Sequence, residues 1–320
     1  MGKIISFANQ KGGVGKTTSC VNVAASLGML GYKVLIIDLD PQGNTTSGVG
    51  IPKKGLKGGT RELLSGKMPV EEIIVDTPFQ NLAVIPTNTA LSSAEFDLFE
   101  FDETEKRMQI ALEPVKDKYD YILIDCPPSL GMLTINAFTA SDGVIVPMQC
   151  EFYALEGLSQ LMITINRIKR LYNPELNVCG ILITMYNGRL LLSMQVMAEL
   201  QKHYSDKLFE TKISRNVKLT EAPGFGRPVF YHDKNSKGAK EYMEVAKELS
   251  TRIEFWRTIM QKKPSGLGRG LGDLLEDNAP EITKSSSRVV IRAEDKRISV
   301  STAELYTERP KNKSVKANYK

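Results

Sequence analysis

The stretch KGGVGKTT, residues 11–18, constrains the fold of this chain more than any other feature. It follows an apolar segment, residues 3–8, that is typical of a buried strand, and it runs directly into a segment with helical spacing. A glycine-rich turn between a strand and a helix presents backbone N–H groups and a helix N-terminus at one point. The stretch therefore predicts a phosphate-binding loop.

This loop departs from the usual pattern G-x-x-x-x-G-K-[ST] in two ways. Position 10 is Gln10 rather than glycine, and the loop carries Lys11 in addition to Lys16. Lys16 stands where a lysine reaches the β- and γ-phosphates, and Thr17 stands where a hydroxyl binds Mg²⁺. The residues predicted to bind the nucleotide here are Lys11, Gly12, Gly13, Val14, Gly15, Lys16, Thr17 and Thr18.

Short apolar segments alternate with helix-like segments over the first 255 residues. The predicted strands are 3–8, 33–38, 82–86, 121–125, 143–147 and 178–184, and the predicted helices include 17–30, 104–118, 155–171 and 191–203. Apolar strands separated by helices predict a mostly parallel sheet covered on both faces. We therefore expect a doubly wound α/β fold of the P-loop NTPase type.

Aspartates follow two of these strands. VLIIDLDPQGN places Asp38 and Asp40 at one strand end, and YDYILIDCPPSLG places Asp125 at another. Ligands of such sheets bind beyond the carboxyl ends of the strands, where carboxylates hold Mg²⁺ directly or through water. A single aspartate at a strand end can also simply cap a turn. Together with the loop, the three aspartates favour a nucleotide site with Mg²⁺.

The C-terminal part of the chain differs in composition. A last helix is predicted over 238–260, and the glycine- and proline-containing stretch KKPSGLGRGLG then ends the helical pattern. We predict a globular domain over 1–260 and a flexible, largely disordered tail over 261–320. Residues 257–320 hold 14 Lys and Arg against 8 Asp and Glu, whereas the remainder holds 28 against 29. Nucleic-acid binding by the globular domain therefore requires a local basic patch.

No apolar run approaches the roughly 20 residues that span a membrane, and the N-terminus has no apolar secretion signal. We therefore expect a cytoplasmic protein without a membrane partner.

The set of motifs resembles the ParA/Soj family of DNA-partitioning ATPases, relatives of the division-site protein MinD. The matching stretches are KGGVGKTT, DLDPQGNTTSG, IDCPPSLG, QCEFYALEGL and SRNVKLTEAPGFGRP, which span the globular part. The resemblance implies slow Mg²⁺-dependent ATP hydrolysis, a homodimer that forms on ATP, and non-specific binding to double-stranded DNA of the nucleoid. It also implies a ParB-type centromere-binding partner, and a chromosome or a plasmid as cargo.

The resemblance implies roles for individual residues of the nucleotide site. Lys11 is the signature lysine, expected to contact the nucleotide of the partner subunit, and it joins Lys16 and Asp40 as a catalytic residue. Asp40 orients the attacking water and, with Thr17 and Asp125, belongs to the metal site. Asn216 contacts adenine, beside Ser214, where the family usually has proline.

The same resemblance implies DNA contacts by Arg189 and Lys218. Lys202, Lys212 and Arg215 lie nearby in sequence, although each of them alone is typical of an ordinary solvated charge.

The tail contains a second resemblance. SGLGRGLGDLLED, residues 265–277, is similar to the extreme N-terminus of ParB. If the likeness is functional, Arg269 acts in cis as an arginine finger, or the segment occupies the groove of the partner and blocks stimulation. A flexible linker, or a basic tail that strengthens DNA binding, explains the same residues.

Three other classes compete with a partitioning ATPase. A MinD-like membrane ATPase would use the amphipathic stretch 245–260, which more often packs on a sheet. A reductase similar to the nitrogenase iron protein would need a second cluster cysteine near Cys126, and none has suitable spacing. A non-enzymatic scaffold would bind nucleotide without turnover.

The tail is tested by comparing ATP turnover of the full chain, a 1–260 truncation and Arg269→Ala. If the tail activates hydrolysis, both variants should turn over ATP more slowly than the full chain. If the tail blocks the partner, added partner should stimulate ATP turnover more strongly in the variants. Equal rates in all three proteins, with and without partner, would contradict both versions.

Overall fold

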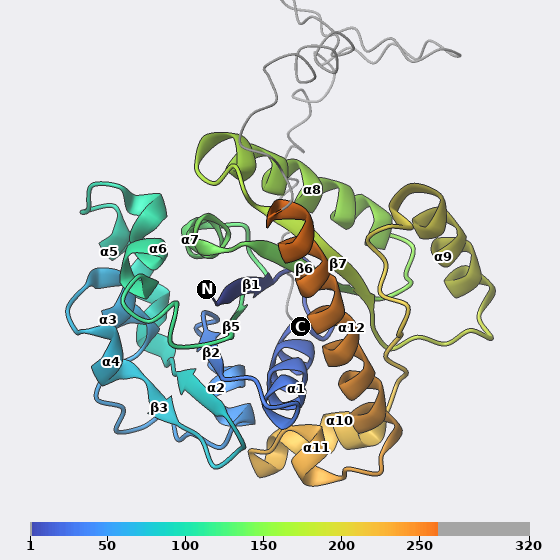
Figure 1. Ribbon diagram of the computed structural model, residues 1–320, viewed down its shortest axis with the longest axis horizontal. Coiled ribbons are helices and arrows are strands. Elements are labelled where there is room, and N and C mark those ends of the chain that lie inside the picture. Colours follow the sequence, from blue (N-terminus) through green and yellow to red (C-terminus); the bar gives the residue numbers. More distant parts are fainter. Residues whose placement is uncertain (1, 262–320) are drawn as a thin grey trace, which may run out of the picture. The chain divides into compact units, whose positions relative to one another are not determined.

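A seven-stranded sheet forms the centre of the described chain, residues 2–261 of this computed structural model (Figure 1). The strand order is β3-β4-β2-β5-β1-β6-β7, and every neighbouring pair is parallel except β3 and β4. The strands are β1 (Lys3–Phe7), β2 (Val34–Asp38), β3 (Val75–Asp76), β4 (Leu82–Ile85), β5 (Tyr121–Asp125), β6 (Gly143–Met148) and β7 (Asn177–Ile183). The predicted doubly wound α/β fold is confirmed.

Helices connect the strands. The helices are α1 (Lys16–Met29), α2 (Asn44–Gly48), α3 (Thr60–Ser65), α4 (Val70–Ile73), α5 (Ala94–Leu98), α6 (Arg107–Leu112), α7 (Met132–Ala140), α8 (Ala154–Leu171), α9 (Leu191–Tyr204), α10 (Val217–Glu221), α11 (Val229–His232) and α12 (Lys237–Gln261). Three 3₁₀ turns, η1 (Thr89–Ser93), η2 (Thr104–Lys106) and η3 (Ala222–Phe225), complete the elements.

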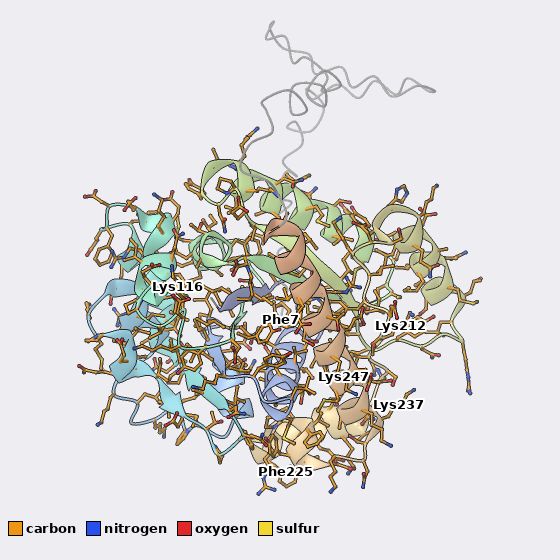
Figure 2. The ribbon with its side chains drawn as sticks, viewed as in Figure 1. Phe7, Lys116, Lys212, Phe225, Lys237 and Lys247 are labelled. Carbon is orange, nitrogen blue, oxygen red and sulfur yellow. The ribbon has the colours of Figure 1, made fainter. Side chains whose placement is uncertain are left out.

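Successive strand residues face two separate hydrophobic cores, because side chains alternate between the faces of a sheet. In β1, Ile5 and Phe7 join the core under α1, α11 and α12, whereas Ile4 joins the core under α6 to α9. Both faces are covered, so the strands are apolar throughout, as expected for a parallel sheet. Phe7 accordingly lies in the interior, fully buried (Figure 2).

The predicted helix 104–118 is wrong in its extent. The structure has a 3₁₀ turn over Thr104–Lys106, a short helix over Arg107–Leu112 and turns over 113–118. The chain has to reverse there to enter β5, so tertiary packing overrides a pattern that suits a longer helix. The sequence reasoning also missed α7, whose stretch MLTINAFTA is apolar on nearly every side and so lacks the helical period.

Helix α12 packs its apolar stripe on the domain. Val245, Leu249 and Ile253 are buried in the core that α1 also covers. No helix of the described residues is long and apolar enough to cross a membrane. The side chains of Trp256 and Met260 and the tail, including 265–277 and Arg269, lie outside the described residues.

Replacing glycine by alanine should change the free energy of unfolding in opposite directions at two helical positions, Gly28 and Gly157. A Cβ at Gly28 of α1 would lie 2.3 Å from the carbonyl oxygen of Gln80, whereas one at Gly157 of α8 would meet no atom within 4 Å. Gly28→Ala should lower the free energy of unfolding by about 1–3 kcal/mol through overpacking. Gly157→Ala should raise it by about 0.5–1 kcal/mol through helix propensity. Urea unfolding measures both, and a stabilised Gly28→Ala protein would contradict the packing of α1 on residues 80–81.

Candidate nucleotide site

Three neighbouring strands end in register at the predicted site. Phe7 of β1 and Asp38 of β2 both pair with Asp125 of β5. The loop that follows β1, the turn that follows β2 and the end of β5 therefore meet at one edge of the sheet, where ligands of such folds bind.

The glycine-rich loop is held in an open turn by left-handed residues and by contacts to its carbonyls. Gly13 and Gly15 have φ values of 72° and 84°, which a residue with a Cβ adopts only with strain. The side chain of Gln149 donates to the Gly13 oxygen at 2.8 Å, and the Thr184 hydroxyl donates to the Val14 oxygen at 2.7 Å. Because the carbonyls are used in this way, the N–H groups of the loop and the first turn of α1 remain to bind an anion.

Lys16 is buried in this loop. Its residue exposure is 7%, and its Nζ lies 3.2 Å from the Lys11 carbonyl oxygen. Burial lowers the pKa of Lys16, while the charges of Asp125 and Asp40 act in the opposite direction. A buried lysine in a phosphate-binding loop is suited to a polyanionic ligand.

Asp125 provides the test of whether the site suits Mg²⁺. Its Oδ2 accepts hydrogen bonds from the hydroxyls of Thr17, at 2.7 Å, and Thr45, at 2.8 Å. Its Oδ1 is the buried side-chain polar atom without a partner among the described residues. An unpartnered carboxylate oxygen beside a threonine hydroxyl matches the hard oxygen ligands that Mg²⁺ prefers. The residues present therefore fit the metal.

Asp38 and Asp40 have different surroundings and therefore different roles. Asp38 is fully buried, and its Oδ2 accepts the backbone N–H of Thr46 at 2.7 Å and the Thr46 hydroxyl at 2.6 Å. Asp38 therefore fixes α2. Asp40 lies in the turn after β2, accepts the N–H of Gln42 at 2.9 Å and acts electrostatically on Lys16 and Asp125.

Lys11 contrasts with Lys16. Its side chain is 43% exposed and forms an ion pair with Glu151, which follows β6. The structure thus places the two lysines of the loop in different environments, one inside the site and one at its open side.

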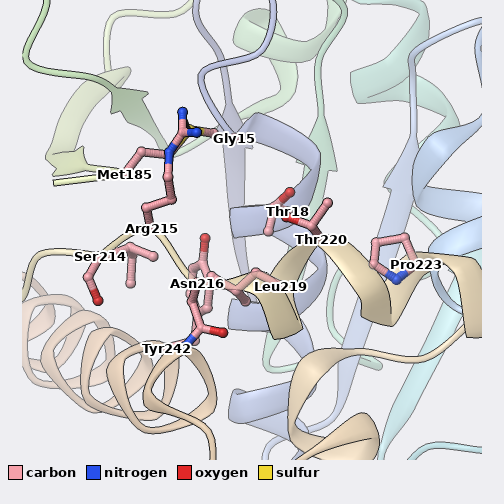
Figure 3. Close-up of a pocket in the computed structure, with 11 residues that line it drawn as sticks. Gly15, Thr18, Met185, Ser214, Arg215, Asn216, Leu219, Thr220, Pro223 and Tyr242 are labelled. Carbon is pink, nitrogen blue, oxygen red and sulfur yellow. Dashed lines mark hydrogen bonds between the residues drawn. The ribbon is translucent and has the colours of Figure 1, made fainter.

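A pocket of about 420 Å³ continues from the loop (Figure 3). It is lined by Gly15, Thr18, Met185, Ile213, Ser214, Arg215, Asn216, Leu219, Thr220, Pro223 and Tyr242. Asn216 caps α10, since its side-chain oxygen accepts the N–H of Lys218 at 2.8 Å. Asn216, the predicted base residue, thus lines the same pocket as Gly15 and Thr18 of the predicted phosphate loop.

Sequence reasoning missed several residues of this site. Thr45 binds Asp125 and Thr46 binds Asp38. Gln149 and Thr184 hold the loop, and Glu241 binds Ser214. The repeated threonines of DLDPQGNTTSG are a signal for the first pair. Gln149 begins the matching stretch QCEFYALEGL, whereas Thr184 and Glu241 come from distant parts of the sequence and carry no local signal.

The residues predicted to bind DNA lie on the surface. Arg189 is exposed in the connection from β7 to α9, and Lys218 of α10 forms an ion pair with Glu221 at 2.9 Å. Lys212 lies over the ring of Tyr186, with 5.8 Å between Nζ and the ring centroid, and Arg215 borders the pocket. No hydrogen bond or ion pair among the described residues joins Arg189 to Lys218.

The parallel sheet, the glycine loop and the Thr17–Asp125 pair define a P-loop nucleotide-binding protein. A family model described as an AAA domain matches residues 2–178. The chain is 50% identical over 250 residues to the sporulation initiation inhibitor protein Soj of Bacillus subtilis, covering 78% of this chain and 99% of that protein. It is 45% identical over 252 residues to the chromosome partitioning protein ParA of Myxococcus xanthus, covering 79% and 89%. The chain belongs to the ParA/Soj family of chromosome-partitioning ATPases.

The chain also resembles solved structures. A cobyrinic acid a,c-diamide synthase from Mycobacterium smegmatis with bound ADP and magnesium superposes with a TM-score of 0.70 at 34% identity, covering 79% of this chain and 96% of that one. The Soj and ParA relatives give the MinD-like alternative no support over the partitioning class.

The buried carboxylates predict a pH dependence of stability. Burial raises the pKa of Asp38 to about 7 and that of Asp125 to about 6. Both values lie above the ordinary carboxyl pKa of 3.8. The stability contributed by the two protonated carboxyls is therefore fully present below that value and is lost as the pH rises from there through the folded pKa values of about 6 and about 7. Asp125→Asn should raise the nucleotide-free stability at pH 7.5 by about 1–3 kcal/mol and abolish stabilisation by Mg²⁺ with ATP.

Thermal melting at pH 5 and pH 7.5, with and without Mg²⁺ and ATP, measures this effect. Asp76→Asn, which removes an exposed carboxylate of β3, is the control and should change neither quantity. An Asp125→Asn protein still stabilised by Mg²⁺ with ATP would rule out Asp125 as a metal-site residue.

Proposed function

We propose that this chain is a Mg²⁺-dependent ATPase that dimerises on ATP, binds double-stranded DNA without sequence preference and partitions a chromosome or plasmid with a ParB-type partner. The observation that carries the proposal is the loop with two lysines of opposite burial. Lys16 is enclosed where the bound phosphates would lie, and Lys11 projects from the open side. Because Lys11 lies outside the nucleotide site of its own subunit, its positive charge is available to the nucleotide of a second subunit.

Within one subunit, the described residues suit phosphoryl transfer to water. Lys16 and the loop N–H groups would hold the phosphates, Thr17 and Asp125 would hold Mg²⁺, and Asn216 would contact the base. When bound, Mg²⁺ would neutralise part of the negative charge of the phosphates. Asp40 would orient the attacking water, since positioning contributes more here than deprotonation by a carboxylate, which is a weak base at neutral pH.

The surface around Lys11 supports dimerisation. Phe152 and Tyr153 follow Glu151, the ion-pair partner of Lys11, and are 74% and 70% exposed. Leu190 and Leu191, 54% and 67% exposed, lie where α9 begins, and Leu190 lines a second pocket together with Glu151. Exposed apolar side chains gathered beside a functional loop are typical of an interface. ATP would draw Lys11 across that interface, because a triphosphate offers more negative charge than Glu151.

Substitutions of the two lysines should separate nucleotide binding from dimerisation. Lys11→Ala should bind ATP with near-normal affinity and remain a monomer, because only the contact to the partner's nucleotide is lost. Lys16→Ala, the matched control in the same loop, should lose ATP binding itself. Calorimetry measures affinity, and size exclusion with light scattering measures mass. A Lys11→Ala protein that dimerises fully on ATP would contradict the proposal.

DNA binding should depend on Arg189 and Lys218. Because phosphate contacts dominate non-specific affinity, Arg189→Ala/Lys218→Ala should weaken binding about tenfold or more and flatten the dependence on salt. The control, Lys116→Ala/Lys118→Ala, removes the same charge near α6, on the opposite side of the view from Lys212 (Figure 2). Filter binding across a salt series with ATP measures both. Equal losses in the two double variants would refute a local patch.

A further inference from the structure

A polar stripe on α12, formed by Glu241, Glu248 and Arg252, faces the segment 208–216 that leads into the base pocket. The three residues are seven and four positions apart, which places them on one face of the helix. Each binds main-chain atoms of this segment. The segment itself forms no regular helix and only isolated bridges to the sheet. Main-chain hydrogen bonds tie Phe209 and Ile213 to β7. The three side chains of α12 hold further main-chain groups of the segment, at residues 208, 210, 211 and 214.

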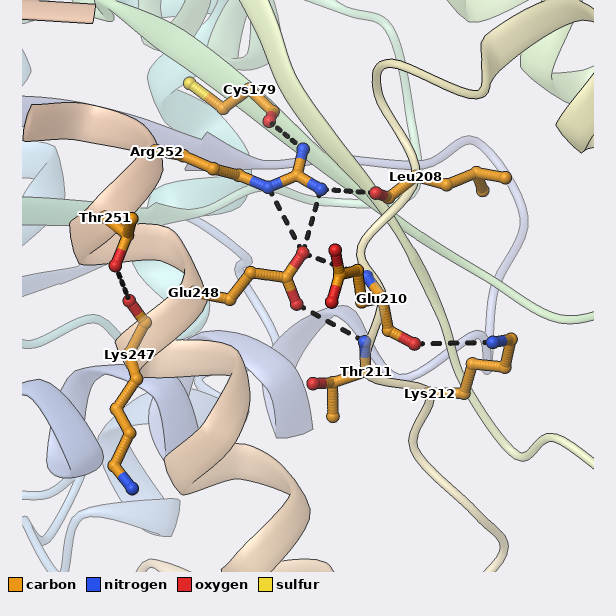
Figure 4. A network of polar contacts seen from close by, with 9 residues as sticks. All are labelled: Cys179, Leu208, Glu210, Thr211, Lys212, Lys247, Glu248, Thr251 and Arg252. Carbon is orange, nitrogen blue, oxygen red and sulfur yellow. Dashed lines mark hydrogen bonds and ion pairs between the residues drawn. The ribbon is translucent and has the colours of Figure 1, made fainter. Parts of the chain in front are cut away.

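The far end of the stripe anchors the start of the segment (Figure 4). Arg252 donates to the carbonyl oxygens of Leu208 and, at 3.4 Å, Cys179. Glu248 accepts the N–H groups of Glu210 at 2.9 Å and Thr211 at 3.3 Å, and pairs with Arg252 at 2.8 Å. These contacts tie residues 208–211 to α12 and to β7.

The near end of the stripe reaches the pocket. Glu241 accepts the backbone N–H of Ser214 at 2.9 Å and the Ser214 hydroxyl at 2.6 Å. Its side chain is only 14% exposed, and Lys237 lies 3.6 Å away. A largely buried carboxylate that accepts two hydrogen bonds from one residue holds that residue firmly, because charge-assisted hydrogen bonds are strong in such surroundings.

Ser214 lies at the start of the chain segment that lines the pocket. It pairs with Tyr186 in an isolated bridge, and the two residues that follow it, Arg215 and Asn216, line the pocket. Asn216 then caps α10. A shift of Ser214 would therefore displace Asn216, although neither Ser214 nor Glu241 belongs to the phosphate loop.

We propose that Glu241 is a positioning residue for the nucleotide base, acting through its two hydrogen bonds to Ser214. The inference rests on the proposed function in one respect, namely that the pocket takes the base of ATP. Ser214 and Glu241 act as a pair. A residue at 214 without these donors would leave a nearly buried carboxylate short of partners, which costs free energy.

Binding of ATP and of inorganic tripolyphosphate to the full chain tests the role of Glu241. Glu241→Ala should weaken ATP binding about five- to tenfold, equivalent to losing a local ordering contact of about 1–1.4 kcal/mol. Tripolyphosphate affinity should not change, because that ligand has no base and contacts the phosphate loop alone. The kcat at saturating ATP should also stay unchanged, while KM rises.

Three variants complete the design. Glu244→Ala, which removes a carboxylate paired with Lys247 on the same helix, should behave like wild type. Ser214→Ala keeps the backbone bond and should weaken ATP binding only two- to threefold, so it tests the idea even if Glu241→Ala fails to fold. The double variant Ser214→Ala/Glu241→Ala should bind no more weakly than Glu241→Ala, because the two residues share one contact.

Several results would overturn the inference. One is normal ATP affinity in both Glu241→Ala and Ser214→Ala, and another is an equal loss of ATP and tripolyphosphate binding, which would indicate general damage. A wild-type chain that binds tripolyphosphate but shows no extra affinity for ATP would contradict the proposed nucleotide function itself.

Discussion

The buried carboxylate of Asp125 is the interaction on which the nucleotide site depends. It ends the strand between β1 and β2 and accepts hydrogen bonds from the hydroxyls of Thr17, in the first turn of α1, and Thr45, in α2. One side chain therefore joins the three segments of the site. Its cost is a negative charge held in the interior, which raises the pKa of Asp125 to about 6. The unpartnered Oδ1 is available to a metal ion, and the nearby Lys16 carries the opposite charge. Both would offset the cost of holding the negative charge in the interior.

The difference between Lys11 and Lys16 follows from where the loop enters α1. Lys16 is the first residue of the helix and lies against the strand ends, so it is buried. Lys11 precedes the left-handed glycines and lies on the outer side, where Glu151 binds it. Two chemically identical side chains five residues apart thus have opposite exposure. This contrast is the basis for the proposal that Lys11 contacts the nucleotide of a second subunit.

The pocket beside Asn216 is supported from outside the phosphate loop. Helix α12 follows the pocket segment in the chain, and its polar stripe holds residues 208–214 while its apolar stripe packs on the core with α1. The same helix also contributes Tyr242, which lines the pocket and binds Ser19 of α1 at 3.0 Å. Helix α12 therefore contributes both to the core of the domain and to the wall of the pocket.

Most of the fold was predictable from the sequence, because parallel strands buried on both faces are apolar runs and six of the seven strands stand out as such. The exceptions have physical causes. Strand β3 has two residues, helix α7 is apolar on nearly every side, and residues 113–118 turn because β5 must begin at Tyr121.

For the site, sequence alone determined the chemistry of the loop, because glycines, lysines and a threonine at fixed spacing between a strand and a helix allow few uses. It also placed Asp125 and Asp40 near that loop, because parallel strands end at one edge. Tertiary structure decided the rest. Only packing shows that Asp38 supports α2, that Lys11 is exposed while Lys16 is buried, and that Glu241 holds Ser214. Those contacts join residues whose partners the local sequence pattern does not specify, so they exist only once the chain is folded.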